Sequence, residues 1–525
     1  MSLVPRGSGK RREEEMSFPL KSPARLLVAV GLAGALLLAT GLPSAALAHD
    51  GDGAEPSGAT VQQEEADSVA DLPRIGHRPC VQGFAGPFRC NMVDLMTFLP
   101  MDDIGGGPGS IYGGPGNDVW GWTDPMTHKE WVIAGRSNGT SFIDASDPKN
   151  PVFVANLPSH GATELHSDIK TYNNHAYIVK DGRDNGIQVF DLTRLRDIDY
   201  ADAPATVDAD AVYEGISNAH DIVINEDTGF AYAVGATRSV ANGTPCHGGG
   251  LHMVDIRDPV NPTYAGCFDD DGYTHDAQCV TYHGPDVRYQ GRELCFAANP
   301  NSPGLVDALT IVDVTDKSNP ALVGRAFEGI PNTYSHQGWL TPDQRYFLHD
   351  DESDNGASRA AIQGRTRTRV FDVTDLTHPF LQSVYHGETR APAHNLYTRG
   401  RYMYNANYID GLRIVDITKI DYPGDEFAPE TPSAPDNQGM YEVACFDTDP
   451  FRNDTGVFPN GRTAWGASWS NYPYFTSGVV AVSGLDGLFL VKPRLGVPAA
   501  SPPALGNNPP TGNPGGNSRY AACLP

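Results

Sequence analysis

Five histidines recur at equivalent places along the sequence, each opening a short stretch in which apolar and polar residues alternate. They are His166, His220, His275, His336 and His394. In four of these five segments the next alternating stretch ends in carboxylate or amide side chains, among them Asp351 and Glu352. Imidazole nitrogens bind Zn, Cu, Mn or Fe, while carboxylates act as further ligands or orient the rings. The pattern therefore predicts a divalent metal site, provided that the fold brings these residues together.

A structural role for the histidines is the alternative. Repeated folds reuse one solution in every unit, so each imidazole could bond the backbone of a neighbouring unit. The residue after the histidine differs between units, being Ser, Asp, Asp, Gln and Asn in chain order, which indicates an asymmetric site. Acidic clusters such as 269–271 could hold Ca instead, although none has the spacing of an EF-hand loop. Solvated acidic turns are the other interpretation of these clusters.

Motifs for other chemistry are missing from the sequence. Gly-x-Ser-x-Gly, His-Glu-x-x-His and the P-loop lysine do not occur. Tryptophans could form a platform for a sugar, but we interpret them as residues that pack between sheets. The six are Trp120, Trp122, Trp131, Trp339, Trp465 and Trp469.

The segments that position the histidines belong to a repeat. The segment ALTIVDVTDKSNPALVG at 308–324 is similar in sequence to the segments at 139–155, 250–266 and 369–385. Each unit contains a strand opened by the histidine, a second strand, the strand with Val-Asp or its equivalent, an Asp-x-x-x-Pro turn and a fourth apolar strand. The Asp side chain caps the turn, and Pro ends the strand ladder. Units of about 45–65 residues with four strands are typical of β-propeller blades.

Counting the units predicts an all-β fold, a seven-bladed β-propeller. The units start near Trp120, His166, His220, His275, His336, His394 and Trp465. The last unit has only three strands, whereas MVDLMTFLP at 92–100 is a strand without a unit. We expect this N-terminal strand to complete blade seven and close the ring, which would leave no open sheet edge.

The N-terminus resembles a secretory signal. Basic Lys21 and Arg25 precede the apolar run at 26–42, and Ala46-Leu47-Ala48 follows as a cleavage site. An uncleaved N-terminal anchor is the alternative. Residues 1–15 contain Leu-Val-Pro-Arg-Gly-Ser, a protease site used in recombinant expression, so Met16 is an alternative native start. The predicted organisation is a signal peptide at 1–48, a flexible acidic lead-in at 49–74, the propeller at 75–498 and a Pro/Gly/Asn-rich tail at 499–525.

Charge narrows the choice of partners. The net charge is −26, and removing six Lys/Arg and three Asp/Glu with residues 1–48 takes it to −29. Such a surface repels nucleic acid and anionic lipid. No second long apolar run follows residue 48, so no membrane span is expected after signal cleavage. We expect a secreted, extracellular protein, alternatively one held at the cell surface, with a protein, a glycan or a small molecule as its partner.

Eight cysteines in an exported chain predict disulfides. Cys80 and Cys90 flank a short loop that leads into the closing strand. Cys279 and Cys295 fall on adjacent strands of one blade, and Cys246 and Cys267 lie at one end of neighbouring strands. The remaining Cys445 and Cys523 would pin the tail to the propeller. In the middle group, a bond between Cys267 and Cys295 is the alternative.

Five sequence motifs together resemble those of the choice-of-anchor B family of secreted LVIVD-repeat proteins. They are NDVWGWTDP (117–125), YTHDAQC (273–279), YSHQGWL (334–340), AHNLYTRGRYMYNANY (393–408) and GLRIVDIT (411–418). The resemblance covers roughly residues 80–493. It implies a propeller that prokaryotes export and tether through varied C-terminal devices, and this chain has no recognisable device of that kind.

The sequence is compatible with two functions. The first is an exported propeller that serves as a binding or interaction scaffold, to which a divalent ion (Zn, Cu, Mn or Ca) at the channel mouth could be added. The second is a metal-dependent oxidoreductase or hydrolase that uses the histidine cluster.

Overall fold

The computed structural model describes residues 68–107, 114–236, 246, 248–300, 308–327, 334–352, 366–387, 389–421, 439–451, 467–495 and 523. The predicted signal peptide, the lead-in up to residue 67, Trp465 and nearly all of the predicted tail lie outside these residues. Within the described part, no helix has the length and apolar character needed to cross a membrane.

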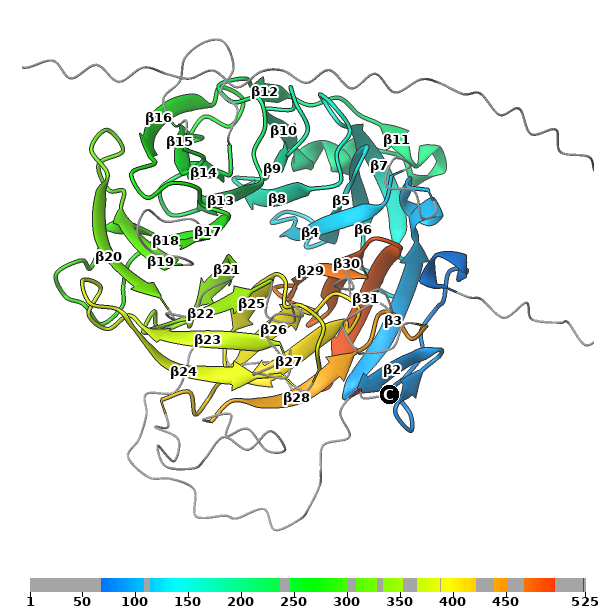
Figure 1. Cartoon of the computed structure of the whole chain (residues 1–525). Coiled ribbons are helices and arrows are strands. Elements are labelled where there is room, and N and C mark those ends of the chain that lie inside the picture. Colours follow the sequence, from blue (N-terminus) through cyan, green and yellow to red (C-terminus); the bar gives the residue numbers. More distant parts are fainter. Residues whose placement is uncertain are drawn as a thin grey trace, which may run out of the picture. The chain divides into compact units, whose positions relative to one another are not determined.

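Seven sheets of mainly antiparallel strands are arranged in a ring, as the sequence predicts (Figure 1). Blade 1 contains β4 (Gly116–Thr123), β5 (Glu130–Arg136), β6 (Gly139–Asp144) and β7 (Val152–Pro158); blade 2 contains β8 (Ser167–Tyr172), β9 (His175–Lys180), β10 (Ile187–Asp191) and β12 (Ala211–Tyr213); blade 3 contains β13 (Asp221–Asn225), β14 (Phe230–Val234), β15 (Leu251–Asp255) and β16 (Thr263–Phe268). Blade 4 contains β17 (Asp276–Thr281), β18 (Glu293–Asn299), β19 (Ala308–Asp313) and β20 (Ala321–Phe327); blade 5 contains β21 (Ser335–Leu340), β22 (Tyr346–Asp351), β23 (Arg367–Asp372) and β24 (Phe380–His386). Blade 6 contains β25 (Leu396–Arg399), β26 (Tyr402–Ala406), β27 (Leu412–Asp416) and β28 (Tyr441–Phe446); blade 7 contains β29 (Ser468–Tyr472), β30 (Val480–Gly484), β31 (Gly487–Pro493) and β3 (Val93–Pro100).

Short elements decorate this ring. β11 (Ala205–Thr206) pairs in parallel with β7, and the 3-10 helices are η1 (Val69–Asp71), η2 (Met101–Ile104), η3 (Leu192–Asp197) and η4 (Tyr200–Asp202). η1 falls within the predicted acidic lead-in, and its Val69 is buried against blades 6 and 7. Regular structure among the described residues therefore includes part of the predicted lead-in, before residue 75.

The Asp-x-x-x-Pro turns act as predicted. The carboxylate of Asp316 accepts a hydrogen bond from the backbone N–H of Ser318 at 3.0 Å, and Asp147 and Asp375 make the equivalent bonds at 3.1 Å. The turn also packs on the preceding blade. A Cβ atom on Gly324 would come within 2.2 Å of the Leu376 carbonyl oxygen, so this position of the outer strand requires glycine.

The innermost strand of each sheet has a free edge, and side chains of the preceding blade bond to its N–H groups. Four such bonds run from Ile169 N to Asp118, from Ile222 N to Asp168, from Leu340 N to Gln278 and from Leu396 N to Gln337, at 3.1, 2.9, 2.8 and 3.0 Å. Because buried N–H groups must be paired, these bonds stabilise the contact between blades.

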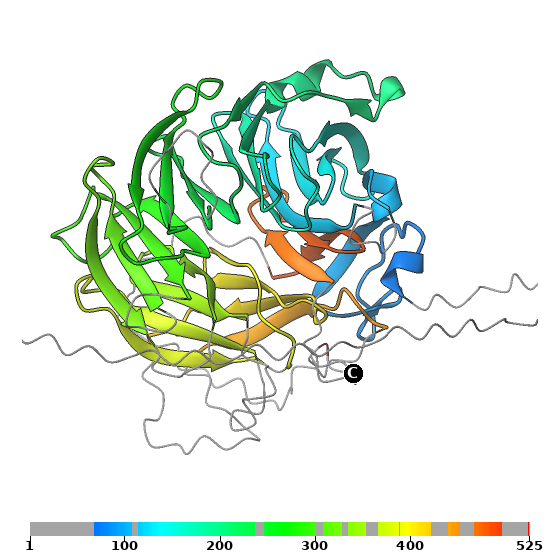
Figure 2. The ribbon, with the colours of Figure 1, turned by 45° about the horizontal axis from the view of Figure 1, so that its top comes forward.

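The N-terminal strand closes the ring, which confirms the prediction for residues 92–100. β3 pairs antiparallel with β31, and the blue β3 lies beside the orange strands of the other chain end (Figures 1 and 2). Phe98 is fully buried, with its ring centroid 4.7 Å from that of Phe489. The preceding hairpin, β1 (Phe84–Ala85) and β2 (Phe88–Asn91), extends blade 6 by pairing β2 with β28. The sequence did not predict this extension.

The structure contains the four predicted disulfides. They join Cys80 to Cys90, Cys246 to Cys267, Cys279 to Cys295 and Cys445 to Cys523. The alternative bond between Cys267 and Cys295 is absent, since both cysteines have other partners and no cysteine is free. Cys523 is thus held at β28 in blade 6, so the bond fixes one point of the predicted tail.

Substitution of a buried residue in the closing strand β3 tests whether this strand closes the propeller. Replacing Phe98 by Ala should lower the free energy of unfolding by about 3–5 kcal/mol, the usual cost of removing a buried phenyl ring. Urea denaturation followed by tryptophan fluorescence measures this. Phe380→Ala is the control, because Phe380 is 56% exposed on the outer strand of blade 5. Equal stability of the two variants would contradict the closing role of β3.

Candidate metal centre

The channel is lined by residues at and just after the starts of the seven innermost strands. The histidines occupy the level at the start of the strands. A second level includes Asp118, Asp221 and Asn395, which line a small void beneath the imidazoles. Seven similar strands thus build levels of unlike side chains.

Six aromatic rings form a closed circle at the channel mouth. The circle runs through His166, His220, His275, His336, His394 and Trp469, one from each of blades 2 to 7. Ring centroids of neighbours are 5.5, 4.3, 4.5, 4.4 and 4.9 Å apart in that order, and Trp469 returns to His166 at 5.3 Å. The structure therefore brings the five predicted histidines together. We refer to these six residues as the histidine ring.

Four imidazoles of the histidine ring are held through Nδ1. His275 Nδ1 is 3.0 Å from the His336 carbonyl oxygen, and His394 Nδ1 bonds to the Trp469 carbonyl oxygen. Carbonyl oxygens only accept, so in both neutral rings Nδ1 carries the proton and Nε2 has a free lone pair. Carboxylates hold the other two: Asp350 lies 3.0 Å from His336 Nδ1 and Asp181 lies 2.8 Å from His220 Nδ1. Metal-binding histidines are commonly oriented in this way.

Glu352 is the carboxylate nearest to the free nitrogens. Its two oxygens lie 3.9 Å from His336 Nε2 and 3.8 Å from His394 Nε2, and Tyr408 donates a hydrogen bond to it at 2.5 Å. Ligand atoms of His275, His336 and Glu352 all lie within 4.8 Å of one another. Small side-chain rotations would bring them to the distance of about 2.0–2.2 Å that Zn ligands adopt.

A second group of potential ligands adjoins the first. His220, Asp221 and His275 also have ligand atoms within 4.8 Å of one another, so His275 is common to both groups. A cavity of ≈ 490 Å³ lies over the histidine ring, and Tyr334, Tyr408 and Glu352 contribute to its wall. The site is therefore accessible to an ion and has room for a small molecule beside it.

Burial keeps most of these imidazoles neutral. It lowers the pKa of His275, with the neighbouring His220 and His336 adding to the effect, and it lowers the pKa of His336 and His394 in the same direction. His220 differs. Burial alone would lower its pKa, but Asp221 and the hydrogen-bonded Asp181 outweigh burial and raise it to about 10. Burial also raises the pKa of Glu352.

Not every predicted residue reaches the site. Asp351 points elsewhere, because its carboxylate pairs with Arg369 at 3.2 Å in the interior of blade 5. In a strand its neighbours Asp350 and Glu352 point to the opposite side, and these two contact the histidine ring. His166 is at the rim, with 41% of its side chain exposed. In the acidic cluster at 269–271, Asp271 is bound by Arg325 at 2.8 Å, which is a structural role.

Sequence reasoning missed several residues of the channel. Trp469, for which the sequence predicts a packing role, belongs to the histidine ring, and a level of acidic side chains lies below the ring. That level contains Asp168, whose carboxylate binds Lys170 at 2.7 Å, and Asp276, whose pKa burial and Asp168 raise to about 7. The signal was present in the sequence as an acid directly after the histidine in blades 3 and 4 and one residue later in blade 2.

Comparisons with known proteins identify the repeat. The LVIVD repeat model matches residues 299–326. No curated protein matches the chain. Among solved structures it is similar to Kuenenia stuttgartiensis hydrazine synthase (10% identity, 67% of this chain and 88% of that one, TM-score 0.43). It is also similar to the Cps50 (Swd1) β-propeller domain of Myceliophteria thermophila (11% identity, 73% and 98%, TM-score 0.40). Similarity at this level has no bearing on chemistry.

The protonation states can be tested on metal-free protein. We expect His275 and His394 to protonate with midpoints below about 6.5, the ordinary value for histidine, because burial lowers their pKa. The unfolded chain then binds more protons than the folded one at acidic pH, so stability conferred by these residues is lost as pH falls through about 6.5. NMR titration of the imidazole carbons measures the midpoints, and assignment uses His275→Gln and His394→Gln. A midpoint above 6.5 for either residue would contradict the burial argument.

Proposed function

We propose that this chain is an exported propeller scaffold that binds one divalent transition-metal ion at the histidine ring. The observation that carries the proposal is the shared orientation of four imidazoles. His220, His275, His336 and His394 each use Nδ1 for a partner in the protein. In His275, His336 and His394, which burial keeps neutral, Nε2 then has a lone pair available for the ion. An imidazole with a purely structural role needs only the hydrogen bond at Nδ1 and does not need a free Nε2.

The donor set favours a transition metal over calcium. His275, His336 and Glu352 offer two imidazole nitrogens and a carboxylate, a combination that suits Zn, Cu, Mn or Fe. Calcium takes six to eight oxygen ligands, and the described wall of the cavity offers one carboxylate, from Glu352. We therefore place Zn, Cu and Mn ahead of Ca.

Export is supported by independent features. Four disulfides are typical of proteins that fold in an oxidising compartment, and the N-terminal sequence has the layout of a signal peptide. Resemblance to the choice-of-anchor B family agrees with both, and it adds the cell surface as a place of action. We propose a secreted or surface-associated protein on these grounds.

A metal-dependent enzyme is the second candidate function. The cavity of ≈ 490 Å³ favours it, because a small molecule would fit beside the ion. A bound transition metal supplies Lewis acidity or an activated water. In this chain Tyr408 would orient Glu352 through its 2.5 Å hydrogen bond. Azide added to Co²⁺-loaded protein distinguishes the two: a changed visible spectrum indicates an open coordination position, as an enzyme requires, and an unchanged one favours the scaffold.

Metal titration of the purified, chelator-treated chain tests the proposal. We expect Zn²⁺, Cu²⁺ or Mn²⁺ to bind with a stoichiometry of one by calorimetry, and a joint His275→Ala and His336→Ala variant to lose this binding. Asp350→Asn should weaken affinity by about 10–100-fold, the usual effect of removing a residue that orients a ligand. Affinity should persist below about pH 6.5, the ordinary pKa of histidine, and should fall only as the pH passes the lowered pKa values of His275 and His336, where protons compete for these imidazoles.

Controls separate the histidine ring from adventitious binding. His378→Ala is the matched control, because the His378 side chain is 83% exposed on the turn of blade 5. Its affinity should equal that of the unmodified chain. Absence of binding for all three ions, or equal binding by the doubly substituted variant, would exclude the metal site.

A further inference from the structure

A second hollow lies at the far end of the same innermost strands. Two adjoining cavities of ≈ 290 and ≈ 450 Å³ share Trp120, Glu226, Gln278, Trp339 and Gln344 in their walls. These residues follow the histidine level along the strands, or lie in the loops just after them. All of the lining residues belong to the described part of the chain. We refer to this hollow as the aromatic pocket. Its larger cavity is of the size that small-molecule sites have.

Two tryptophans from different blades are held rigidly in the aromatic pocket. Trp120 of blade 1 and Trp339 of blade 5 both pack edge-on against Tyr397 of blade 6, with ring centroids 5.5 and 5.0 Å apart. Tyr472 contacts Trp120 at 5.1 Å, and Lys170 Nζ lies 4.6 Å from the centre of the Trp120 ring. Only Trp120 and Trp339, out of the five tryptophans that the structure describes, line this hollow. Rigid aromatic surfaces bind ligands at low entropic cost.

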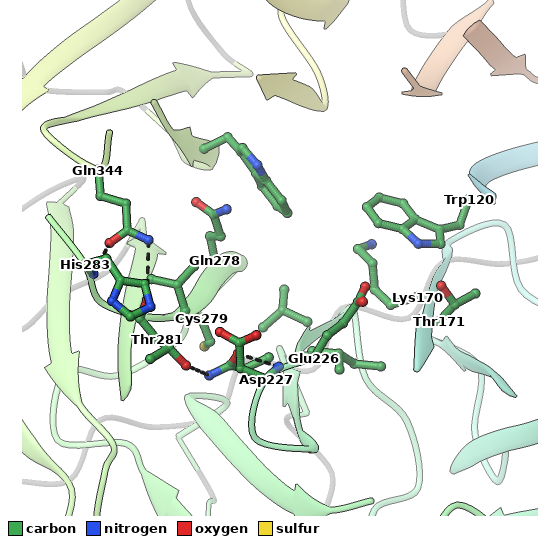
Figure 3. A pocket seen from close by; sticks show the side chains of 15 residues that line it. Trp120, Lys170, Thr171, Glu226, Asp227, Gln278, Cys279, Thr281, His283 and Gln344 are labelled. Carbon is green, nitrogen blue, oxygen red and sulfur yellow. Dashed lines mark hydrogen bonds between the residues drawn. The ribbon is translucent and has the colours of Figure 1, made fainter. Parts of the chain in front are cut away.

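Some polar groups of the aromatic pocket form hydrogen bonds within the protein. The polar groups that have no such partner determine which hydrogen-bonding groups a ligand must carry. Gln278 Oε1 accepts from Leu340 N at 2.8 Å and Gln344 Oε1 accepts from His283 N at 2.6 Å, so both amides direct their NH₂ groups away from these contacts. The NH₂ of Gln278 has no partner among the described residues, and neither does the carboxylate of Glu226. Figure 3 shows Gln278 on one side of the hollow, Trp120 on the other and Glu226 between them.

We infer that the aromatic pocket binds a neutral saccharide. A sugar ring has an apolar C–H face that can lie on an indole, and its hydroxyls both accept from an amide NH₂ and donate to a carboxylate. The free groups of Gln278 and Glu226 supply this pair of opposite requirements. The inference concerns a site separate from the histidine ring, and it does not depend on metal binding.

Other ligand classes fit less well. An anion would meet the carboxylates of Glu226 and Asp227, while the one ammonium in the wall, that of Lys170, is neutralised by Asp168 at 2.7 Å. An organic cation would suit tryptophan and Glu226, but its cationic group offers no acceptor to the Gln278 NH₂ group. A purely apolar ligand would leave both polar groups without partners, which costs free energy.

Disaccharide binding to the full chain tests the inference. The probes are cellobiose, maltose and N,N′-diacetylchitobiose, with choline as the organic cation. We expect saturable binding of at least one disaccharide, detected by saturation-transfer NMR and by a change of tryptophan fluorescence. Gln278→Glu keeps an acceptor for Leu340 N but loses the amide donor, and it should weaken binding about tenfold. Trp339→Ala should abolish binding.

Matched measurements keep the result interpretable. Phe380→Ala, on the exposed outer strand of the blade that carries Trp339, should bind like the unmodified chain. Circular dichroism verifies folding of each variant, and Gln278→Glu provides the test if Trp339→Ala does not fold. Failure of all three disaccharides to bind, stronger binding of choline than of any sugar, or undiminished binding by folded Gln278→Glu would overturn the inference.

Discussion

Pairing between the two ends of the propeller is the interaction on which the rest of the structure depends. β3 supplies the fourth strand of blade 7 and pairs with β31 along seven residue pairs, from Val93 with Pro493 to Pro100 with Gly487. Without it, blade 7 would end in an exposed edge and the ring would be open. The circle of aromatic rings and the aromatic pocket require a closed propeller, because each one combines side chains from the first and the last blades, such as His166 with Trp469 and Trp120 with Tyr472. Two disulfides constrain the chain near this strand pair. Cys80–Cys90 lies just before β3, and Cys445–Cys523 lies at the outer strand of blade 6.

The innermost strands share one backbone arrangement but differ in their side chains. The backbone of every blade repeats, and side chains such as Asp118, Asp168, Gln278 and Gln337 bond the N–H groups of the next strand. These bonds fix the strands relative to one another, so a residue at a given level always meets its counterpart in the neighbouring blade. The side chain itself can then vary. Blade 7 places Trp469 where blades 2 to 6 place histidine, and the channel becomes asymmetric on a regular scaffold.

The two ends of the channel present different chemistry on one rigid frame. At one mouth, imidazoles with free Nε2 atoms surround Glu352, an arrangement suited to a metal ion. At the other, Trp120 and Trp339 flank Tyr397 beside polar groups with opposite hydrogen-bonding character. Between them lie the buried Asp118, Asp168 and Asp276 with Lys170, and the half-buried Asp221. Because the same strands carry both sites, neither needs a mobile loop to position its main residues, and rigid elements favour precise sites.

The sequence by itself determined the seven blades, the closing strand, the four disulfides and the meeting of five histidines, since each follows from a repeat or from neighbouring strands. It misplaced Asp351, because the side of a strand to which a residue points changes with a shift of one position. Tertiary structure alone decided that β2 extends blade 6, that Nδ1 rather than Nε2 of four histidines is occupied, and that Trp120 and Trp339 share one hollow. These contacts join residues from different blades, and their geometry depends on closure of the whole ring rather than on any local pattern.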